Sequence, residues 1–142
     1  CVAILLSKNV MYIANCGDSR AYKYTDKSLI KLTNDQTYVN YLYRTGKITE
    51  NQTLTHPERH VLMNALGIFP SLSLDLSILP YKGEGILLCS DGLYNNVPER
   101  EIYAIAKCDD RVDQKVNALI GEANTNGGSD NIAVAIWEAN ND

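Results

Sequence analysis

The sequence contains no run of 18 apolar residues, so it predicts no membrane-spanning helix. Residues 1–6 are apolar with no basic segment ahead of them, so we do not expect them to be a secretory signal peptide. Basic residues are also outnumbered, 13 to 17 by acidic ones, and the net charge of −4 argues against a nucleic-acid-binding protein. We therefore expect a cytoplasmic protein with neither a nucleic-acid nor a membrane partner.

None of the four cysteines belongs to a Cys-x-x-Cys pair, the spacing typical of zinc and redox sites. Two of them lie in apolar, strand-like runs. We expect buried, reduced thiols, as in cytoplasmic proteins. A disulfide framework or a zinc site is the alternative.

Internal repeats and low-complexity segments are also missing, and 142 residues suffice for one domain with its own core. The first residue is not Met, and the chain begins inside what reads as a strand. We therefore expect residues 1–142 to be part of a longer protein.

Hydrophobic periodicity predicts strands followed by helices and further strands, with no room for parallel crossovers near the N-terminus. The expected helices occupy residues 35–46, the segment after Pro98, and residues 112–123, and residues 48–59 read as a polar surface loop. The expected strands are 2–6, 10–14, 21–24, 29–32, 71–79, 86–89 and 132–137. In the strand at 71–79, leucine and isoleucine alternate with polar residues, which predicts that it is half-buried. This order indicates the α+β class.

The stretch 86–93 (ILLCSDGL) organises the chain. Its apolar run predicts a fully buried strand, and the strand delivers Asp91 to its end. Gly92 then permits a sharp turn or the close approach of another group. A carboxylate at the edge of a core needs a partner, which a metal ion, a buried arginine or backbone N–H groups could provide.

Three acidic residues share this setting, since Asp18, Asp91 and Asp130 each follow glycine or serine at an expected strand end. Fixed carboxylates with small neighbours suit hard divalent cations, which take one or two carboxylates each and complete their shell with water. Two such ions can polarise a phosphate group and ionise a water molecule. The alternative is that each aspartate caps a turn of its own backbone.

Five segments together resemble the successive signatures of metal-dependent protein serine/threonine phosphatases of the 2C type, especially bacterial ones. In chain order they are NCGDSRA at 15–21, LTNDQT at 32–37, HPERHVL at 56–62 with ALG at 65–67, CSDGL at 89–93, and GGSDNI at 127–132. The resemblance covers the chain from end to end and corresponds to the C-terminal portion of such a domain.

The resemblance implies part of a β-sandwich flanked by antiparallel helices, and hydrolysis of phosphoserine and phosphothreonine in proteins by water activated on two Mn²⁺ or Mg²⁺ ions. It assigns Asp91 and Asp130 as ligands of the metal pair and Asp18 as a ligand of a possible third ion. Ser90, Gly92 and Asn131 would lie beside the metal site.

The resemblance also implies a variable flap linked to substrate choice, which includes Ile48, His56, Arg59 and His60. His56 could protonate a leaving group, although a structural role is expected for a histidine before proline, and likewise for His60. The implied partners are a phosphoprotein substrate and a serine/threonine kinase.

The family's Glu-Asp pair, its metal-bridging aspartate and its phosphate-binding arginine have no counterpart in this sequence. We therefore expect the isolated chain to be weak or inactive, and to pair with the missing N-terminal half or to self-associate. A different class of function, a non-catalytic pseudophosphatase module that binds a kinase or phosphoprotein, stays open. So does a small-molecule phosphatase.

Overall fold

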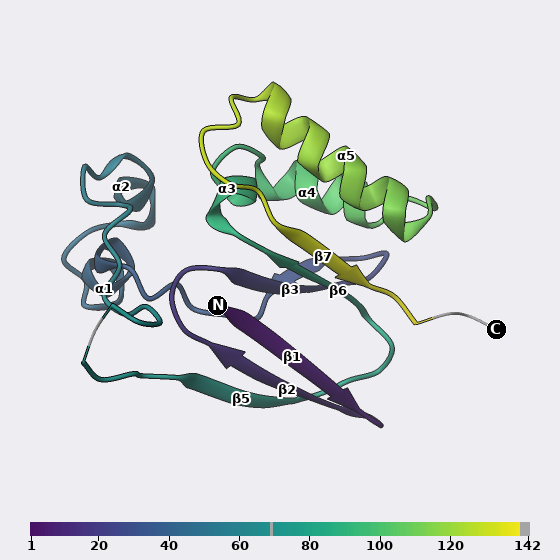
Figure 1. The fold of residues 1–142 in the computed structure, drawn as a ribbon, viewed down its shortest axis with the longest axis horizontal. Coiled ribbons are helices and arrows are strands. Elements are labelled where there is room, and N and C mark those ends of the chain that lie inside the picture. Colours follow the sequence, from purple (N-terminus) through teal and green to yellow (C-terminus); the bar gives the residue numbers. More distant parts are fainter. Residues whose placement is uncertain (69, 140–142) are drawn as a thin grey trace. The chain divides into compact units, whose positions relative to one another are not determined.

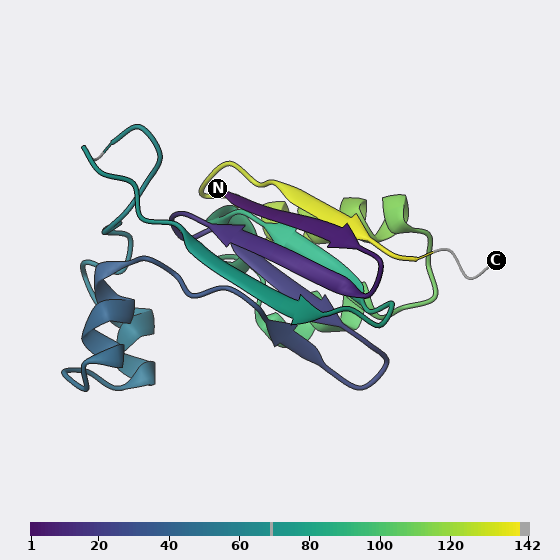
Figure 2. The ribbon, with the colours of Figure 1, turned by 90° about the horizontal axis from the view of Figure 1, so that it is seen from below.

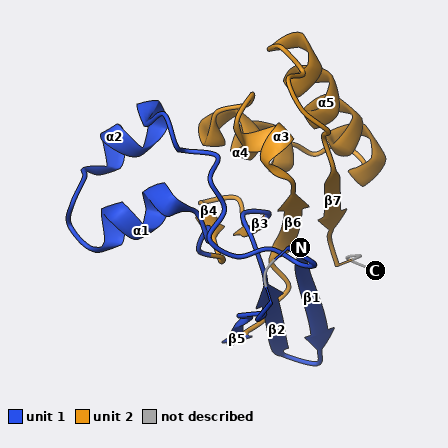
Figure 3. Ribbon diagram, turned by 60° about the vertical axis from the view of Figure 1, so that its left-hand side comes forward, with its two compact units in different colours: residues 1–19, 34–79 blue, residues 20–33, 80–142 orange. Residues whose placement is uncertain are grey.

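The computed structural model describes residues 1–68 and 70–139, and it divides the chain into two compact units. The first comprises residues 1–19 and 34–79, and the second comprises residues 20–33 and 80–142 (Figure 3). Each unit combines an antiparallel sheet with helices of its own. The predicted α+β class is therefore confirmed.

The sheet of the first unit has the strand order β1-β2-β5. Strands β1 (Val2–Ser7) and β2 (Val10–Asn15) form a hairpin that pairs all six residues of each strand, with β5 (Asp75–Pro80) as the third strand (Figure 2). Lys8 occupies the left-handed region at φ 53° in the hairpin turn. The hairpin matches the predicted strands to within one residue at each end.

Two short helices follow in the first unit, α1 (Tyr38–Arg44) and α2 (Glu50–Thr55). The side chain of Thr37 caps α1 by accepting a hydrogen bond from the backbone N–H of Asn40, so the helix begins later than residue 35, where the pattern placed its start. Helix α2 contradicts the prediction of a loop at 48–59. Thr49 and Gln52 form a capping box at its start, which stabilises a helix without any apolar face.

The prediction of a half-buried strand at 71–79 is wrong in two respects. Residues 71–74 lie outside β5, which begins at Asp75. The alternating Leu72, Leu74, Leu76 and Ile78 are all exposed, at 48 to 72% of their surface. An alternating pattern indicates which residues share a face, but the burial of that face depends on what packs against it.

The second unit contains a four-stranded antiparallel sheet with the order β4-β3-β6-β7. Its strands are β3 (Arg20–Tyr24), β4 (Leu29–Lys31), β6 (Gly85–Cys89) and β7 (Val134–Trp137). The buried strand predicted at 86–89 is therefore confirmed as β6, in the middle of this sheet. Trp137, at the end of β7, is 56% exposed.

Helices α3 (Asp91–Tyr94), α4 (Glu99–Ala106) and α5 (Val112–Thr125) belong to the second unit, with α4 and α5 side by side (Figure 1). Their apolar residues form one core with the side chains on one face of the sheet. The fully buried members of this core include Tyr22, Leu87, Leu93, Ile102 and Leu119. Since α3 follows β6 directly, this core fixes the end of the strand from which Asp91 emerges.

Among the helices at residues 1–68 and 70–139, none is long and apolar enough to span a membrane. Cys16 and Cys89 are buried thiols, as predicted, whereas Cys108 is half-buried and Cys1 is exposed.

Candidate metal site

Asp91 is positioned by the junction between β6 and α3. Ser90 has extended backbone angles (φ −78°, ψ 169°) and precedes the first residue of α3 as its N-cap, so Asp91 lies in the first helical turn. The side chain of Asp91 is half-buried. A buried strand thus presents a partly accessible carboxylate, as the sequence predicted.

Ser90 connects this junction to the segment that carries Asp130. Its backbone N–H donates to the carbonyl oxygen of Ala133 at 3.0 Å, and its hydroxyl accepts from the N–H of Ala133 at 2.9 Å. The same hydroxyl donates to the carbonyl oxygen of Asn131 at 3.1 Å. Three hydrogen bonds at one serine therefore hold the two acid-bearing segments, about 40 residues apart in sequence, against each other.

Gly92 allows this close approach. A Cβ atom on Gly92 would overlap the carbonyl oxygen of Asn131 and lie 2.9 Å from its carbonyl carbon. It would also lie 3.3 Å from Cγ1 of Ile132. The predicted reason for the glycine, close approach of another group, is therefore confirmed, and that group is the backbone beside Asp130.

Asp130 itself is exposed, and its Oδ1 accepts the backbone N–H of Asn131 at 2.7 Å. An aspartate that caps a turn bonds the backbone two residues on, so this bond to the adjacent N–H is not the turn cap that the sequence left open as the alternative to metal binding. It engages one carboxylate oxygen. The left-handed glycines Gly127 (φ 129°) and Gly128 (φ 51°) lead the chain out of α5 towards Asp130.

Arg20 forms an ion pair with Glu99. Its guanidinium lies 3.4 Å above the ring of Tyr94 and its Nη1 lies 3.7 Å from Oε1 of Glu99. The hydroxyl of Tyr22 donates to the same Glu99 oxygen at 2.9 Å. Burial raises the pKa of Tyr22 far above its ordinary value, against a smaller opposing effect of Arg20. Arg20 therefore fastens α3, on which Asp91 stands, to β3 and α4.

Asp18 belongs to the first unit, where its loop is held by Gln36. Gly17 (φ 103°) donates its N–H to Oε1 of Gln36 at 2.7 Å, and the N–H of Gln36 returns to the carbonyl of Gly17 at 3.0 Å. Asn64 donates its side-chain amide to the same Oε1 at 2.7 Å. Sequence reasoning missed Gln36 and Asn64 because their partners lie 19 and 28 residues away.

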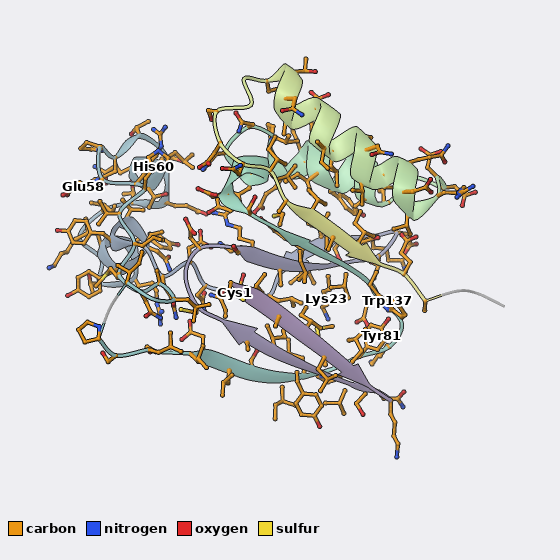
Figure 4. The ribbon with its side chains drawn as sticks, in the orientation of Figure 1. Cys1, Lys23, Glu58, His60, Tyr81 and Trp137 are labelled. Atoms are coloured by element: carbon orange, nitrogen blue, oxygen red, sulfur yellow. The ribbon has the colours of Figure 1, made fainter. Side chains whose placement is uncertain are left out.

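The residues predicted to form a flap surround α2. Ile48 is half-buried just before the N-cap of α2, and His56 follows the last residue of the helix. Nδ1 of His56 accepts the N–H of Glu58 at 3.1 Å, so this imidazole stabilises a turn. Nε of Arg59 donates to Nε2 of His60 at 3.0 Å. Figure 4 shows Glu58 and His60 together in the turn that follows α2. These contacts agree with a structural role for both histidines.

The donors fit a divalent metal ion in kind, because carboxylate oxygens on rigid backbone are ligands that Mn²⁺ and Mg²⁺ accept. They do not form a complete site. Within the part of the chain that the structure describes, no three His, Cys, Asp or Glu side chains gather closely enough to hold a metal ion. Two carboxylates and neighbouring waters supply only part of the ligands of a two-ion centre.

No protein-family model matches the chain. It is 39% identical over 140 residues to the serine/threonine phosphatase stp of Listeria welshimeri, an alignment that covers 98% of this chain and 56% of the relative. It is 33% identical over 135 residues to a putative 2C-type protein phosphatase of Streptococcus pyogenes, covering 94% of this chain and 55% of that protein. The chain thus spans about half the length of the curated relatives it matches.

Solved structures agree with these sequences. The serine/threonine phosphatase Stp1 of Staphylococcus aureus superimposes with a TM-score of 0.91 at 32% identity, over 100% of this chain and 56% of that one. The catalytic domain of the serine/threonine protein phosphatase PstP, crystallised with two manganese ions, superimposes with a TM-score of 0.82 at 31% identity. That match covers 95% of this chain and 55% of the other.

Proposed function

We propose that the chain contributes one side of a two-metal centre in a protein serine/threonine phosphatase. The proposal is supported by its similarity to the C-terminal portion of bacterial serine/threonine phosphatases of the 2C type. Asp91 and Asp130 are the proposed metal ligands, and Asp18 the proposed ligand of a further ion. The substrates are phosphoserine and phosphothreonine in proteins. When bound, divalent ions at such a centre lower the pKa of water and polarise phosphate oxygens.

One observation carries this proposal. Ser90 and Gly92 on one side, and Asn131 and Ala133 on the other, join the segments that bear the two acids. The junction fixes the backbone that bears both aspartates, and carboxylates on rigid backbone are ligands that divalent cations take. The manganese in the related PstP structure supports the same cation class for this chain.

The chain alone is proposed to be a weak catalyst. The described residues offer fewer than three clustered metal-binding side chains. The remaining ligands would come from the part of the relatives' domain that the chain does not span, either in the same protein or in an N-terminal half supplied separately. We also propose that the protein acts in the cytoplasm and that a serine/threonine kinase is its functional partner.

The test compares manganese binding and hydrolysis of p-nitrophenyl phosphate, using the 142-residue chain and a protein that includes the preceding half of the domain. In the longer protein, Asp91→Asn and Asp130→Asn should each lower activity by more than the roughly 10- to 100-fold that losing an outer-shell partner costs. Asp109→Asn, on the exposed turn before α5, removes the same charge as a control.

Calorimetry should show weaker manganese binding for both site variants and wild-type binding for Asp109→Asn. Wild-type affinity in Asp91→Asn and Asp130→Asn would refute the proposal and favour the non-catalytic binding module. Strong manganese-dependent hydrolysis by the 142-residue chain alone would refute the incomplete-site part of it.

A further inference from the structure

Asp130 stands between two tethered neighbours. On its C-terminal side, Asn131 is tied to the hydroxyl of Ser90. On its N-terminal side, the hydroxyl of Ser129 donates to Oδ1 of Asn96 at 3.5 Å. Asn96 is half-buried just beyond α3, the helix that begins with Asp91. The tether to Ser129 therefore runs between the same two segments as the Ser90 junction, but on the other side of Asp130.

The side chain and the backbone of Asn96 are both used in this connection. Its Nδ2 donates to the carbonyl oxygen of Gly92 at 2.8 Å, while its backbone N–H goes to Leu93 at 3.0 Å. The amide of Asn96 thus closes the last turn of α3, where backbone carbonyls lack helical partners. This bond also fixes the direction in which Oδ1 points.

The carbonyl oxygen of Asn96 holds the end of α5. It accepts Nδ2 of Asn126 at 3.1 Å, and the same Nδ2 reaches Oε1 of Glu122 at 3.1 Å. Gly127 lies close enough that a Cβ atom there would be 3.5 Å from Oδ1 of Asn96. Asn96 therefore hydrogen-bonds both ends of the turn that leads from α5 to Asp130, at Asn126 and at Ser129.

We propose that Asn96 is a positioning residue for the metal site, holding the 126–129 turn against α3 so that Asp130 keeps a fixed relation to Asp91. This rests on the proposed function of the two aspartates as metal ligands. Within the described residues, the hydrogen-bond partners of the Asn96 side chain and carbonyl are Gly92, Asn126 and Ser129, and neither carboxylate is among them. Its role is to reduce the number of conformations that the Asp130 loop samples before an ion binds, which lowers the entropic cost of binding.

The first experiment measures ¹⁵N relaxation of the metal-free 142-residue chain. In Asn96→Ala the backbone order parameters of residues 127–130 should fall from about 0.85, typical of rigid backbone, towards about 0.6. Ser129→Ala removes only the exposed hydroxyl tether and should have a smaller effect in the same place. Asn117→Ala, an identical change on the exposed side of α5, should leave these values unchanged.

The second experiment measures manganese affinity by calorimetry in the longer protein, at a temperature where all variants are folded. Asn96→Ala should bind manganese about fivefold more weakly, because the loop loses the stabilisation of roughly one hydrogen bond before the ion binds. The double variant Asn96→Ala/Ser129→Ala should be no weaker than Asn96→Ala alone, because both changes remove the same tether.

Unchanged order parameters in Asn96→Ala would refute the tether. Altered order parameters with wild-type affinity, while Asp130→Asn binds weakly, would refute the positioning role and leave the proposed function intact. Wild-type affinity in Asp130→Asn would refute the proposed function itself, and with it any role of Asn96 in metal binding.

Discussion

Replacing Gly92 by alanine tests the junction on which the candidate site depends. The backbone of Gly92 is not in the left-handed region, so alanine introduces no backbone strain, and its effect comes from the added methyl group alone. That group would overlap the carbonyl oxygen of Asn131. Restoring a normal contact distance requires a separation of about 1 Å between α3 and the segment after Asp130.

The cost follows from what this separation breaks. Relieving the overlap costs about 1–3 kcal/mol, and the two hydrogen bonds of the Ser90 hydroxyl contribute about 1 kcal/mol each when lost. We therefore expect the free energy of unfolding to fall by about 3–5 kcal/mol, and Tm by about 6–20 °C for a chain of this size. Manganese affinity of the longer protein should fall as well.

Gly121→Ala is the matched control. Gly121 lies on the exposed side of α5, and a Cβ atom there meets nothing within 4 Å. Because alanine favours a helix over glycine by about 1 kcal/mol, this variant should be more stable than wild type. Urea unfolding followed by circular dichroism measures both variants. Equal stability of Gly92→Ala and wild type would show that the junction tolerates a methyl group and that the argument from close approach is wrong.

Two further predictions concern the second unit. Leu119→Ala, at a fully buried position of α5, should lower the free energy of unfolding by about 2–5 kcal/mol in a urea titration, and a loss below 1 kcal/mol would contradict its place in the core. Glu84 is partly buried, which by itself raises its pKa, but backbone N–H groups and Lys23 outweigh this and lower the pKa below its ordinary value. Ionised Glu84 should therefore stabilise the fold above about pH 4.3, and that contribution should disappear as the pH falls through the lowered pKa. The stability difference between wild type and Glu84→Gln should be larger at pH 7 than at pH 3, and a constant difference would contradict this assignment.

Residues that act through their immediate neighbours were accessible from the sequence. The apolar run before Ser90 predicted a buried strand ending at Asp91, and β6 is that strand. The glycine after Asp91 predicted close approach, which the contact with Asn131 confirms. Thr49 and Gln52 have the spacing of a capping box, which would have predicted α2, but the polar composition of 48–59 led to the prediction of a loop.

Contacts between distant segments required the structure. The partners of Ser90 lie 41 and 43 residues away, and Asn96 meets Asn126 and Ser129 across 30 and 33 residues. Nothing in the local pattern distinguishes Asn96 from the exposed Asn95 beside it.

The difference between what the sequence predicts and what requires the structure has a physical reason. Backbone propensity, capping and alternation act over a few residues, so the sequence by itself determined where the main strands and helices lie and which glycines permit a turn or a close approach. Which carbonyl a side chain reaches depends on how those elements pack, because packing sets distances between residues far apart along the chain. The tertiary structure alone therefore decided that Ser90 and Asn96 hold the Asp130 segment from its two ends.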